Sequence, residues 1–166
     1  MRVNLEEDEY IIASLPKIWG IALGLAGFFH KSKEGVLALT NENLIFVPRF
    51  LQLMSREREK YFGDDKAKVI KLANYSEVDL DEDISKNSKT WIIPLNSLLD
   101  AESITTRKVN FLRITFKDEK NKLKKYDFAI TRSVINYPQR QPLMYYSLDW
   151  TAWINLLKSH IADKTT

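Results

Sequence analysis

The stretch of sequence that decides the fold runs Gly35-Val36-Leu37-Ala38-Leu39-Thr40-Asn41-Glu42-Asn43-Leu44-Ile45-Phe46-Val47. It contains two short apolar runs, and the three polar residues 41–43 separate them. Short apolar runs around an Asn-containing connection are typical of a β-hairpin. The stretch therefore predicts two antiparallel strands joined by a tight turn.

Further strands are predicted on both sides of this hairpin. Residues 112–117 and 125–130 alternate apolar and polar side chains around a charged turn, which predicts a second antiparallel pair with one solvent-exposed face. A first strand is predicted over 8–14, ending before the next proline. Another is predicted over 91–95, where Pro94 marks a strand end or an edge strand.

The chain closes with a predicted amphipathic helix, which follows an irregular approach after Pro142. Ser147 or Asp149 is placed to cap the N-terminus of this helix. A helix with two tryptophans on its sheet-facing side would plug a small, curved sheet. The apolar residues with helical spacing are Trp150, Trp153, Ile154, Leu157 and Ile161.

The composition limits the chemistry of the chain. Its 166 residues suit one domain, spanning 1–166. There is no cysteine, and His30 and His160 are the two histidines, which excludes disulfides, thiol catalysis and Cys- or His-rich metal sites. The acidic run 79–83 lacks the glycine and the glutamate that a calcium loop needs. We expect no catalytic residue, no metal site and no cofactor.

Residues 50–90 are predicted to be an insertion or long loop with a short helix, placed between the third and fourth strands. Within them the part from Asn74 to Thr90 is acidic and weakly apolar. Such a composition lacks the apolar side chains that a packed segment needs. We therefore expect residues 74–90 to form a solvated surface loop.

Charge is distributed unevenly along the sequence. Residues 74–103 hold seven acids and two bases, whereas residues 104–125 hold eight bases and two acids, although the net charge of the chain is only +3. The basic segment favours either a solvated hairpin whose lysines guard strand edges or a patch for anionic headgroups or an acidic protein surface.

The uncharged run 18–29 allows two interpretations. As a helix it would span about 18 Å, less than the ~30 Å hydrocarbon core of a bilayer. It is either a buried loop or strand pair interrupted by glycines, or an exposed apolar loop that enters a membrane or an oligomer interface. The candidate residues for insertion or an interface are Trp19, Ile21, Leu23, Leu25, Phe28 and Phe29.

The fold-deciding hairpin resembles the G-x-L-x-L-T-x-x-x-L-x-F hairpin of GRAM domains and bacterial pleckstrin-homology (PH)-like domains. Ile93-Pro94-Leu95 with Leu98 is similar to the I-P-L-x-x-I step of that family, and the Trp-bearing terminal helix is similar to the helix that closes its barrel. The resemblance covers residues 8–161. It implies a mainly β, α+β fold: a seven-stranded, two-sheet, partly open barrel capped by one long C-terminal amphipathic helix.

The resemblance also implies where an anionic headgroup would bind, between the loops that follow the first and third strands. The second predicted strand has no basic residue, however, unlike that of the lipid-binding members. The corresponding candidate residues are Lys17, His30, Lys31, Lys33, Arg49, Arg56 and Arg58.

The sequence therefore favours a non-catalytic interaction module that binds a protein partner or forms a homo-oligomer. The alternative is a peripheral membrane module that binds anionic lipid through an apolar loop and a basic patch. A nucleic-acid partner is not favoured, because the aromatic residues fall mostly at core positions and leave few rings to stack on bases. The acidic N-terminus lacks the features of a secretory signal, so we expect a cytoplasmic location, with membrane association only under the alternative.

Overall fold

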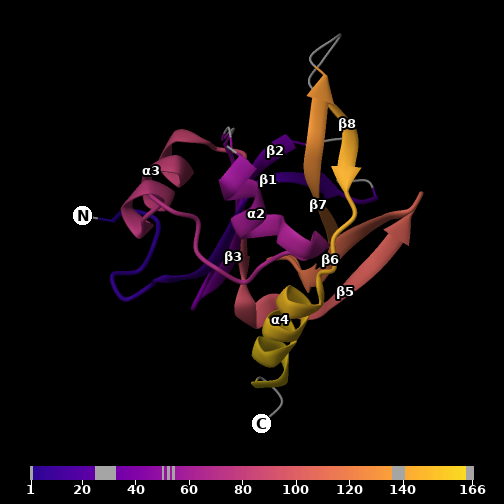
Figure 1. Ribbon diagram of the computed structural model, residues 1–166. Coiled ribbons are helices and arrows are strands. Elements are labelled where there is room, and N and C mark those ends of the chain that lie inside the picture. The colour runs from indigo at the N-terminus through magenta and orange to yellow at the C-terminus, as the bar shows by residue number, and fades with distance from the viewer. Residues whose placement is uncertain are drawn as a thin grey trace.

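The computed structural model describes residues 2–24, 33–49, 51, 53, 55–135 and 141–163. These residues form a mainly β protein with one antiparallel sheet and a C-terminal helix (Figure 1). The strand order is β4-β3-β2-β1-β7-β6-β5, and β8 pairs with the C-terminal part of β7. The strands are β1 (Ile11–Ala22), β2 (Lys33–Thr40), β3 (Asn43–Pro48), β4 (Trp91–Pro94), β5 (Leu98–Thr106), β6 (Val109–Lys117), β7 (Leu123–Ile135) and β8 (Gln141–Tyr146).

The long strand β1 lies in the middle of the sheet, where it joins the half formed with β2, β3 and β4 to the half formed by β7, β6 and β5. It pairs with β2 along one edge and with β7 along the other. The expectation that the first strand ends before Pro16 is wrong. Pro16 and Lys17 lie together opposite Val36, in a bulge where Lys17 has a φ of 59°. A bulged residue makes no ladder hydrogen bond, so a proline that lacks an N–H is accommodated there and the strand continues to Ala22.

Both predicted hairpins are confirmed. In the first, β2 and β3 pair with Leu39 opposite Leu44. The Thr40 hydroxyl accepts the backbone N–H groups of Glu42 and Asn43 at 3.1 and 2.9 Å and so closes the turn. In the second, β6 and β7 pair across the turn at 118–122. The irregular approach expected before the terminal helix is wrong, because residues 141–146 form β8 against the end of β7.

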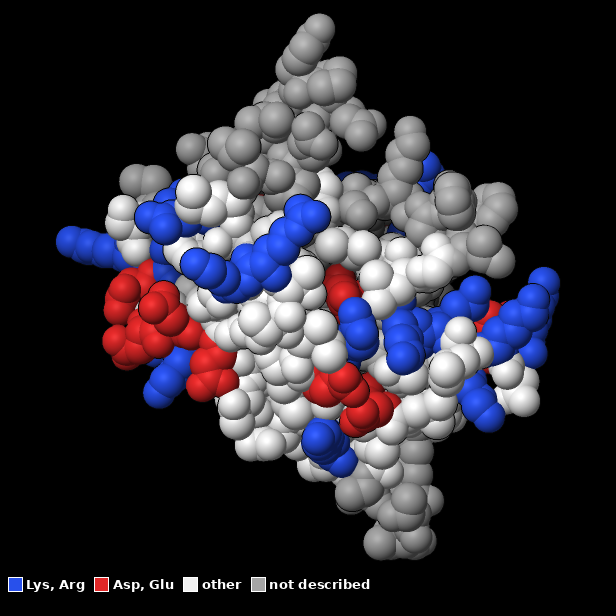
Figure 2. All heavy atoms as spheres, turned by 90° about the vertical axis from the view of Figure 1, so that its right-hand side faces the viewer, with Lys and Arg blue, Asp and Glu red and all other residues white. Residues whose placement is uncertain are grey.

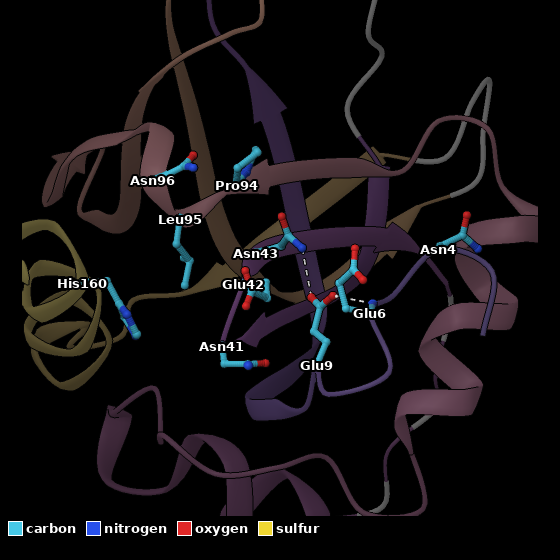
Figure 3. Close-up of a pocket in the computed structure, with 10 residues that line it drawn as sticks. All are labelled: Asn4, Glu6, Glu9, Asn41, Glu42, Asn43, Pro94, Leu95, Asn96 and His160. Atoms are coloured by element: carbon cyan, nitrogen blue, oxygen red, sulfur yellow. Dashed lines mark hydrogen bonds between the residues drawn. The ribbon is translucent and has the colours of Figure 1, made fainter. Parts of the chain in front are cut away.

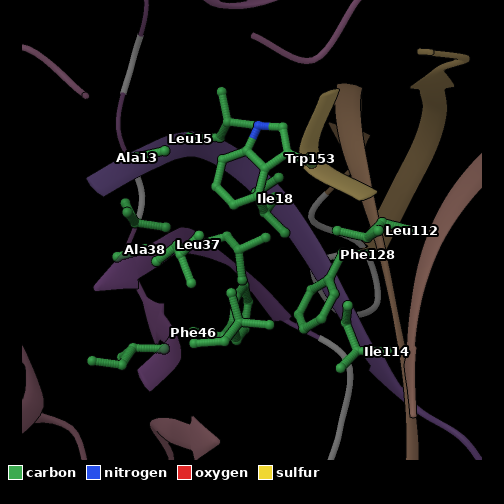
Figure 4. Packing of buried hydrophobic residues seen from close by; sticks show 14 of the residues in the cluster. Ala13, Leu15, Ile18, Leu37, Ala38, Phe46, Leu112, Ile114, Phe128 and Trp153 are labelled. Carbon is green, nitrogen blue, oxygen red and sulfur yellow. The ribbon is translucent and has the colours of Figure 1, made fainter. Parts of the chain in front are cut away.

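The terminal helix α4 (Thr151–Asp163) covers one end of the sheet, as predicted. The side chains of Trp150, Trp153 and Leu157 are buried in the core. In Figure 4, Trp153 reaches from α4 towards Leu15 and other core residues of β1. The carboxylate of Asp149 accepts the N–H of Thr151, so Asp149 caps the first turn.

The segment between β3 and β4 contains the predicted short helix and one that was not expected. It comprises α2 (Ser55–Phe62), the 3₁₀ turn η1 (Gly63–Asp65) and α3 (Glu77–Lys86); a second 3₁₀ turn, η2 (Leu95–Ser97), follows β4. The prediction of a solvated loop over 74–90 is wrong. Ser76 and Asp79 form a capping box, and Leu80 and Ile84, one helical turn apart, are buried in the core.

A carboxylate on α3 holds the N-terminal segment against the fold. The side chain of Asp81 is buried, and it accepts the backbone N–H groups of Val3, Asn4 and Leu5 at 2.9, 2.8 and 2.9 Å. Burial by itself opposes ionisation of Asp81, but the three N–H donors outweigh it and lower its pKa. The ionised carboxylate is therefore the form that stabilises the folded chain.

We expect Asp81→Asn to destabilise the protein by about 1–3 kcal/mol, because an amide weakens three bonds to a charged acceptor and sets its NH₂ group against donors. The matched control is Glu82→Gln on the exposed face of α3, which should leave stability unchanged.

Since the folded-state pKa of Asp81 is depressed, the contribution of Asp81 to folding stability is complete above the ordinary carboxyl pKa of about 4 and is lost as the pH falls below that value. Urea unfolding at neutral and acidic pH checks this. Equal destabilisation by Asp81→Asn at both pH values would contradict it.

Candidate functional site

An apolar groove of about 680 Å³ lies beside β4, which is one edge of the open sheet. We call it the β4 groove. The fold brings its lining together from β4 and the turn after it, and from the ends of β6 and β7 that meet at the 118–122 turn. The lining residues are Thr90, Trp91, Ile92, Ile93, Pro94, Asn96, Ser97, Phe116, Lys117, Asp118, Glu119 and Tyr126.

Aromatic rings form the apolar part of the β4 groove. The ring centroids of Trp91 and Tyr126 lie 4.3 Å apart, and those of Phe116 and Tyr126 lie 5.0 Å apart. Behind Trp91, Gly20 of β1 leaves space for the indole, because a Cβ there would lie 2.9 Å from the Trp91 Cζ3 atom. Burial, and then the charge of Asp118, raise the pKa of Tyr126, so its phenol stays neutral at physiological pH.

The free edge of β4 presents backbone groups on the side away from β3. The N–H of Leu95 donates to the carbonyl of Glu42 at 3.0 Å, in register with the β3–β4 ladder. Because alternate residues of an antiparallel strand face the same neighbour, Ile92 and Pro94 direct their backbone groups away from β3. Pro94 has no N–H, so Ile92 supplies the one donor of this edge. The Ile92 side chain is 45% exposed.

A second hollow, of about 310 Å³, shares Asp118 and Glu119 with the β4 groove, and its remaining lining is Lys120, Lys122 and Lys124. We call it the lysine hollow. The carboxylate of Asp118 accepts the N–H groups of Lys120 and Lys122, each at 2.9 Å, and lies 3.9 Å from the Lys124 ammonium. These N–H bonds, that of Lys122 above all, lower the pKa of Asp118. Asp118 therefore holds the β6–β7 turn.

A polar hollow of about 440 Å³ lies by the β2–β3 turn, with His160 of α4 at one side (Figure 3). Its buried carboxylate, that of Glu9, accepts hydrogen bonds from the Thr40 hydroxyl, the Asn43 amide at 2.9 Å and the Glu6 N–H at 3.2 Å. Glu9 therefore ties the turn to the segment that precedes β1. The threonine of the hairpin motif has a structural role, since it joins the turn to this carboxylate.

Two described members of the predicted headgroup site, Lys17 and Arg49, are held within the fold. Lys17 was expected in the loop after the first strand, but it is buried in the β1 bulge, five residues or about 17 Å before the strand ends. Arg49 makes a bidentate ion pair with Asp83 of α3 at 2.8 and 2.9 Å, and its guanidinium lies 5.4 Å from the ring centre of Tyr75. It therefore anchors α3.

The other predicted basic residues lie on α2, at the start of β2 or outside the described part of the chain. Arg56 is exposed on α2 and Arg58 is half-buried there. Lys33 is the first residue of β2, and its backbone pairs with Gly20. His30 and Lys31 lie outside the described residues.

The apolar run 18–29 is partly a strand, so its first residues follow the buried alternative and not the exposed-loop alternative. Trp19 and Ile21 lie in β1 opposite Ala129 and Asp127 of β7, and the Trp19 side chain is buried. Leu23 is half-buried, and its N–H donates to the Lys125 carbonyl at 3.0 Å. The three remaining candidates, Leu25, Phe28 and Phe29, lie outside the described residues.

The basic segment 104–125 does not form one patch. Arg107 and Lys108 make the turn between β5 and β6, and Lys117 lies at the other end of β6, roughly 30 Å away for a nine-residue strand. Between them, Arg113 makes a bidentate ion pair with Asp127 of β7 at 2.8 and 2.9 Å. On the face shown in Figure 2, small groups of basic side chains lie beside small groups of acidic side chains, and the described residues form no single basic patch on this face.

Within residues 2–24, 33–49, 51, 53, 55–135 and 141–163 no three His, Asp or Glu side chains are grouped as a metal site would require. No helix in the same ranges is long and apolar enough to cross a membrane.

Sequence reasoning missed the β4 groove, although one signal for it was present. Trp91 opens a predicted edge strand, and an edge strand leaves one side without a neighbour. The partners of Trp91 in the groove, Phe116 and Tyr126, come from 25 and 35 positions further along the chain. Alternation correctly assigned both to the core, but it could not show that their rings also line a groove beside β4. A comparison of the sequence with protein-family models and with curated proteins found no match.

Proposed function

We propose that this chain is a non-catalytic interaction module of the PH-like type, which binds an extended segment of a partner protein in the β4 groove. The PH-like part of the proposal is supported by the sheet. One half is β1–β4, the other is β5–β7, β1 joins them, and α4 covers one end. Strand β8 and the helical segment between β3 and β4 are additions to that pattern.

The observation that carries the binding proposal is the aromatic lining of the groove beside an unpaired strand edge. An extended segment lying along β4 could hydrogen-bond to the N–H and C=O of Ile92. An apolar side chain of the same segment would then contact the exposed edges of Trp91, Phe116 and Tyr126. A neighbouring side chain of the segment would cover Ile92, which points to the opposite face of β4 and is exposed. Rigid aromatic walls supply contact area with little loss of side-chain entropy.

Pro94 and the short length of β4 limit how the edge can pair. With a single N–H donor, β4 cannot template a long intermolecular sheet, which protects this edge from edge-to-edge aggregation. Side-chain contacts in the groove must then supply most of the affinity, and the backbone bonds at Ile92 set the direction of the segment. This division suits a selective binding groove better than open-ended strand addition.

The test compares two exposed residues on edge strands β4 and β5. Ile92 on β4 and Leu99 on β5 are each 45% exposed, so Ile92→Lys and Leu99→Lys make the same change at equal exposure. Short random peptides displayed on phage are selected on the unmodified protein, and their affinities are measured by fluorescence polarisation. We expect Ile92→Lys to weaken the selected peptides at least about tenfold and Leu99→Lys to leave them unchanged. Peptides insensitive to Ile92→Lys, or no enrichment at all, would overturn the proposal.

The same variants separate the alternative functions. Light scattering tests self-association, and a dimer that Ile92→Lys dissociates would place a second copy in the groove instead of a foreign segment. Co-sedimentation with neutral and anionic vesicles tests the membrane alternative. Binding to anionic vesicles that Ile92→Lys does not change, together with no selected peptide, would favour a membrane module over the proposed one.

A further inference from the structure

We infer that the segment held in the β4 groove carries carboxylate side chains close to its apolar anchor, and that the lysine hollow selects for them. This inference rests on the function proposed above, because it names the chemistry of the occupant of the same groove. It starts from the two hollows: the groove and the lysine hollow share Asp118 and Glu119, so they adjoin at these residues.

The β6–β7 turn carries more positive than negative charge. Lys117, Lys120, Lys122, Lys124 and Lys125 stand against two carboxylates in residues 117–125. Lys117, Lys120 and Lys122 are exposed, and no carboxylate of the described residues lies within ion-pair distance of them. These three ammonium groups are available to a ligand.

The carboxylates of the turn do not cancel this charge. Asp118 accepts two backbone N–H groups and lies near Lys124, so the charge of its carboxylate is compensated within the turn. Glu119 remains at the border between the two hollows. A basic segment would therefore meet one available carboxylate against three lysines, whereas an acidic segment would meet complementary charge.

Lysine residues at the rim of an apolar groove select ligands by their charge, but they add little to the binding affinity. The flexible, strongly hydrated ammonium group of lysine gives modest attraction at an exposed site, and salt screens that attraction. Such rim charges mainly raise the association rate and reject partners of the wrong sign. The groove would then supply the affinity, and the lysine hollow would determine which apolar segments are accepted.

The test applies the phage-displayed random peptides to the full chain and to the double variant Lys120→Glu/Lys122→Glu, which changes two exposed lysines of the lysine hollow. We expect the unmodified protein to enrich peptides in which Asp or Glu lies within a few positions of an apolar or aromatic residue. The double variant should bind those peptides at least about fivefold more weakly at low salt, and the difference should shrink as salt is added. The matched control, Lys71→Glu/Lys158→Glu, changes the net charge equally at exposed lysines away from the groove and should keep the affinity.

The outcomes distinguish this inference from the proposed function. Neutral or basic peptides that bind the unmodified protein and are lost on Ile92→Lys would overturn the inference while supporting the groove. An equal loss of affinity in the control double variant would also overturn it, because the effect would then come from net charge. If no peptide depends on Ile92, the proposed function fails and the inference fails with it. Circular dichroism of each variant verifies that it is folded.

Discussion

Replacing Gly35 by alanine is expected to destabilise the fold by about 3 kcal/mol or more, at the upper end of the cost of overpacking a core. A Cβ on Gly35 would lie 2.2 Å from the carbonyl oxygen of Val47, across the β2–β3 ladder. That oxygen belongs to the backbone of a buried strand, so neither partner can rotate away. The two strands would have to separate, and the fold-deciding hairpin would lose its register.

Thermal unfolding followed by circular dichroism checks this prediction. For a chain of this size, 3 kcal/mol corresponds to a fall in Tm of about 6–12 °C. Gly24→Ala is the control: Gly24 has a φ of 72°, but no atom of the described residues lies within 4 Å of the added Cβ. Its cost should be that of the left-handed conformation, about 1–2 kcal/mol. A Gly35→Ala variant that melts within a degree or two of the unmodified protein would contradict the close approach of β2 and β3.

Replacing Trp153 by alanine is expected to cost about 3–5 kcal/mol, the range for removing a large aromatic side chain from a core. Trp153 is completely buried between α4 and the sheet, and its Nε1–H donates to the Lys68 carbonyl at 3.0 Å. Its loss would leave a cavity and an unpaired carbonyl. It would also release α4 from the segment that follows α2.

Two variants separate these contributions in urea unfolding. Trp153→Phe keeps most of the apolar contact but removes the hydrogen bond, so it should cost about 1–3 kcal/mol. Asn155→Ala, on the exposed face of α4, should change stability little and serves as the control. A Trp153→Ala variant with the stability of Asn155→Ala would show that α4 does not close the core.

The sequence predicted most of the sheet because hairpins are local. In the β2–β3 and β6–β7 pairs the alternation of side chains and the turn residues lie within a few positions of each other. The same holds for α4, whose apolar stripe and capping residue Asp149 are adjacent in the chain. Errors occurred where a local signal was opposed by a distant partner. Pro16 signalled a strand end, but pairing of β1 with both β2 and β7 carries the strand through the bulge.

Residues 74–90 show that distant partners can also override the local sequence signal of a helical segment. Their acidity indicated a solvated loop, yet α3 is fixed by contacts that composition cannot show. Asp81 binds the N-terminal backbone, and Asp83 binds Arg49 and the hydroxyl of Tyr75. Charged residues were therefore judged available when they were already paired. Arg49, which the family resemblance placed in a headgroup site by its position, is paired with Asp83.

The sequence by itself determined the hairpins, the terminal helix, the mainly β class and the exclusion of cysteine chemistry, because each depends on residue types or short-range periodicity. Only the tertiary structure decided which charges are free and where a ligand could bind. The basic stretch 104–125 is contiguous in sequence, yet strand β6 holds Arg107 and Lys108 roughly 30 Å from Lys117. Trp91, Phe116 and Tyr126 are distant in sequence, yet the curled sheet brings them into one groove. A binding surface is a property of strand order and register, which join residues that no sequence window contains.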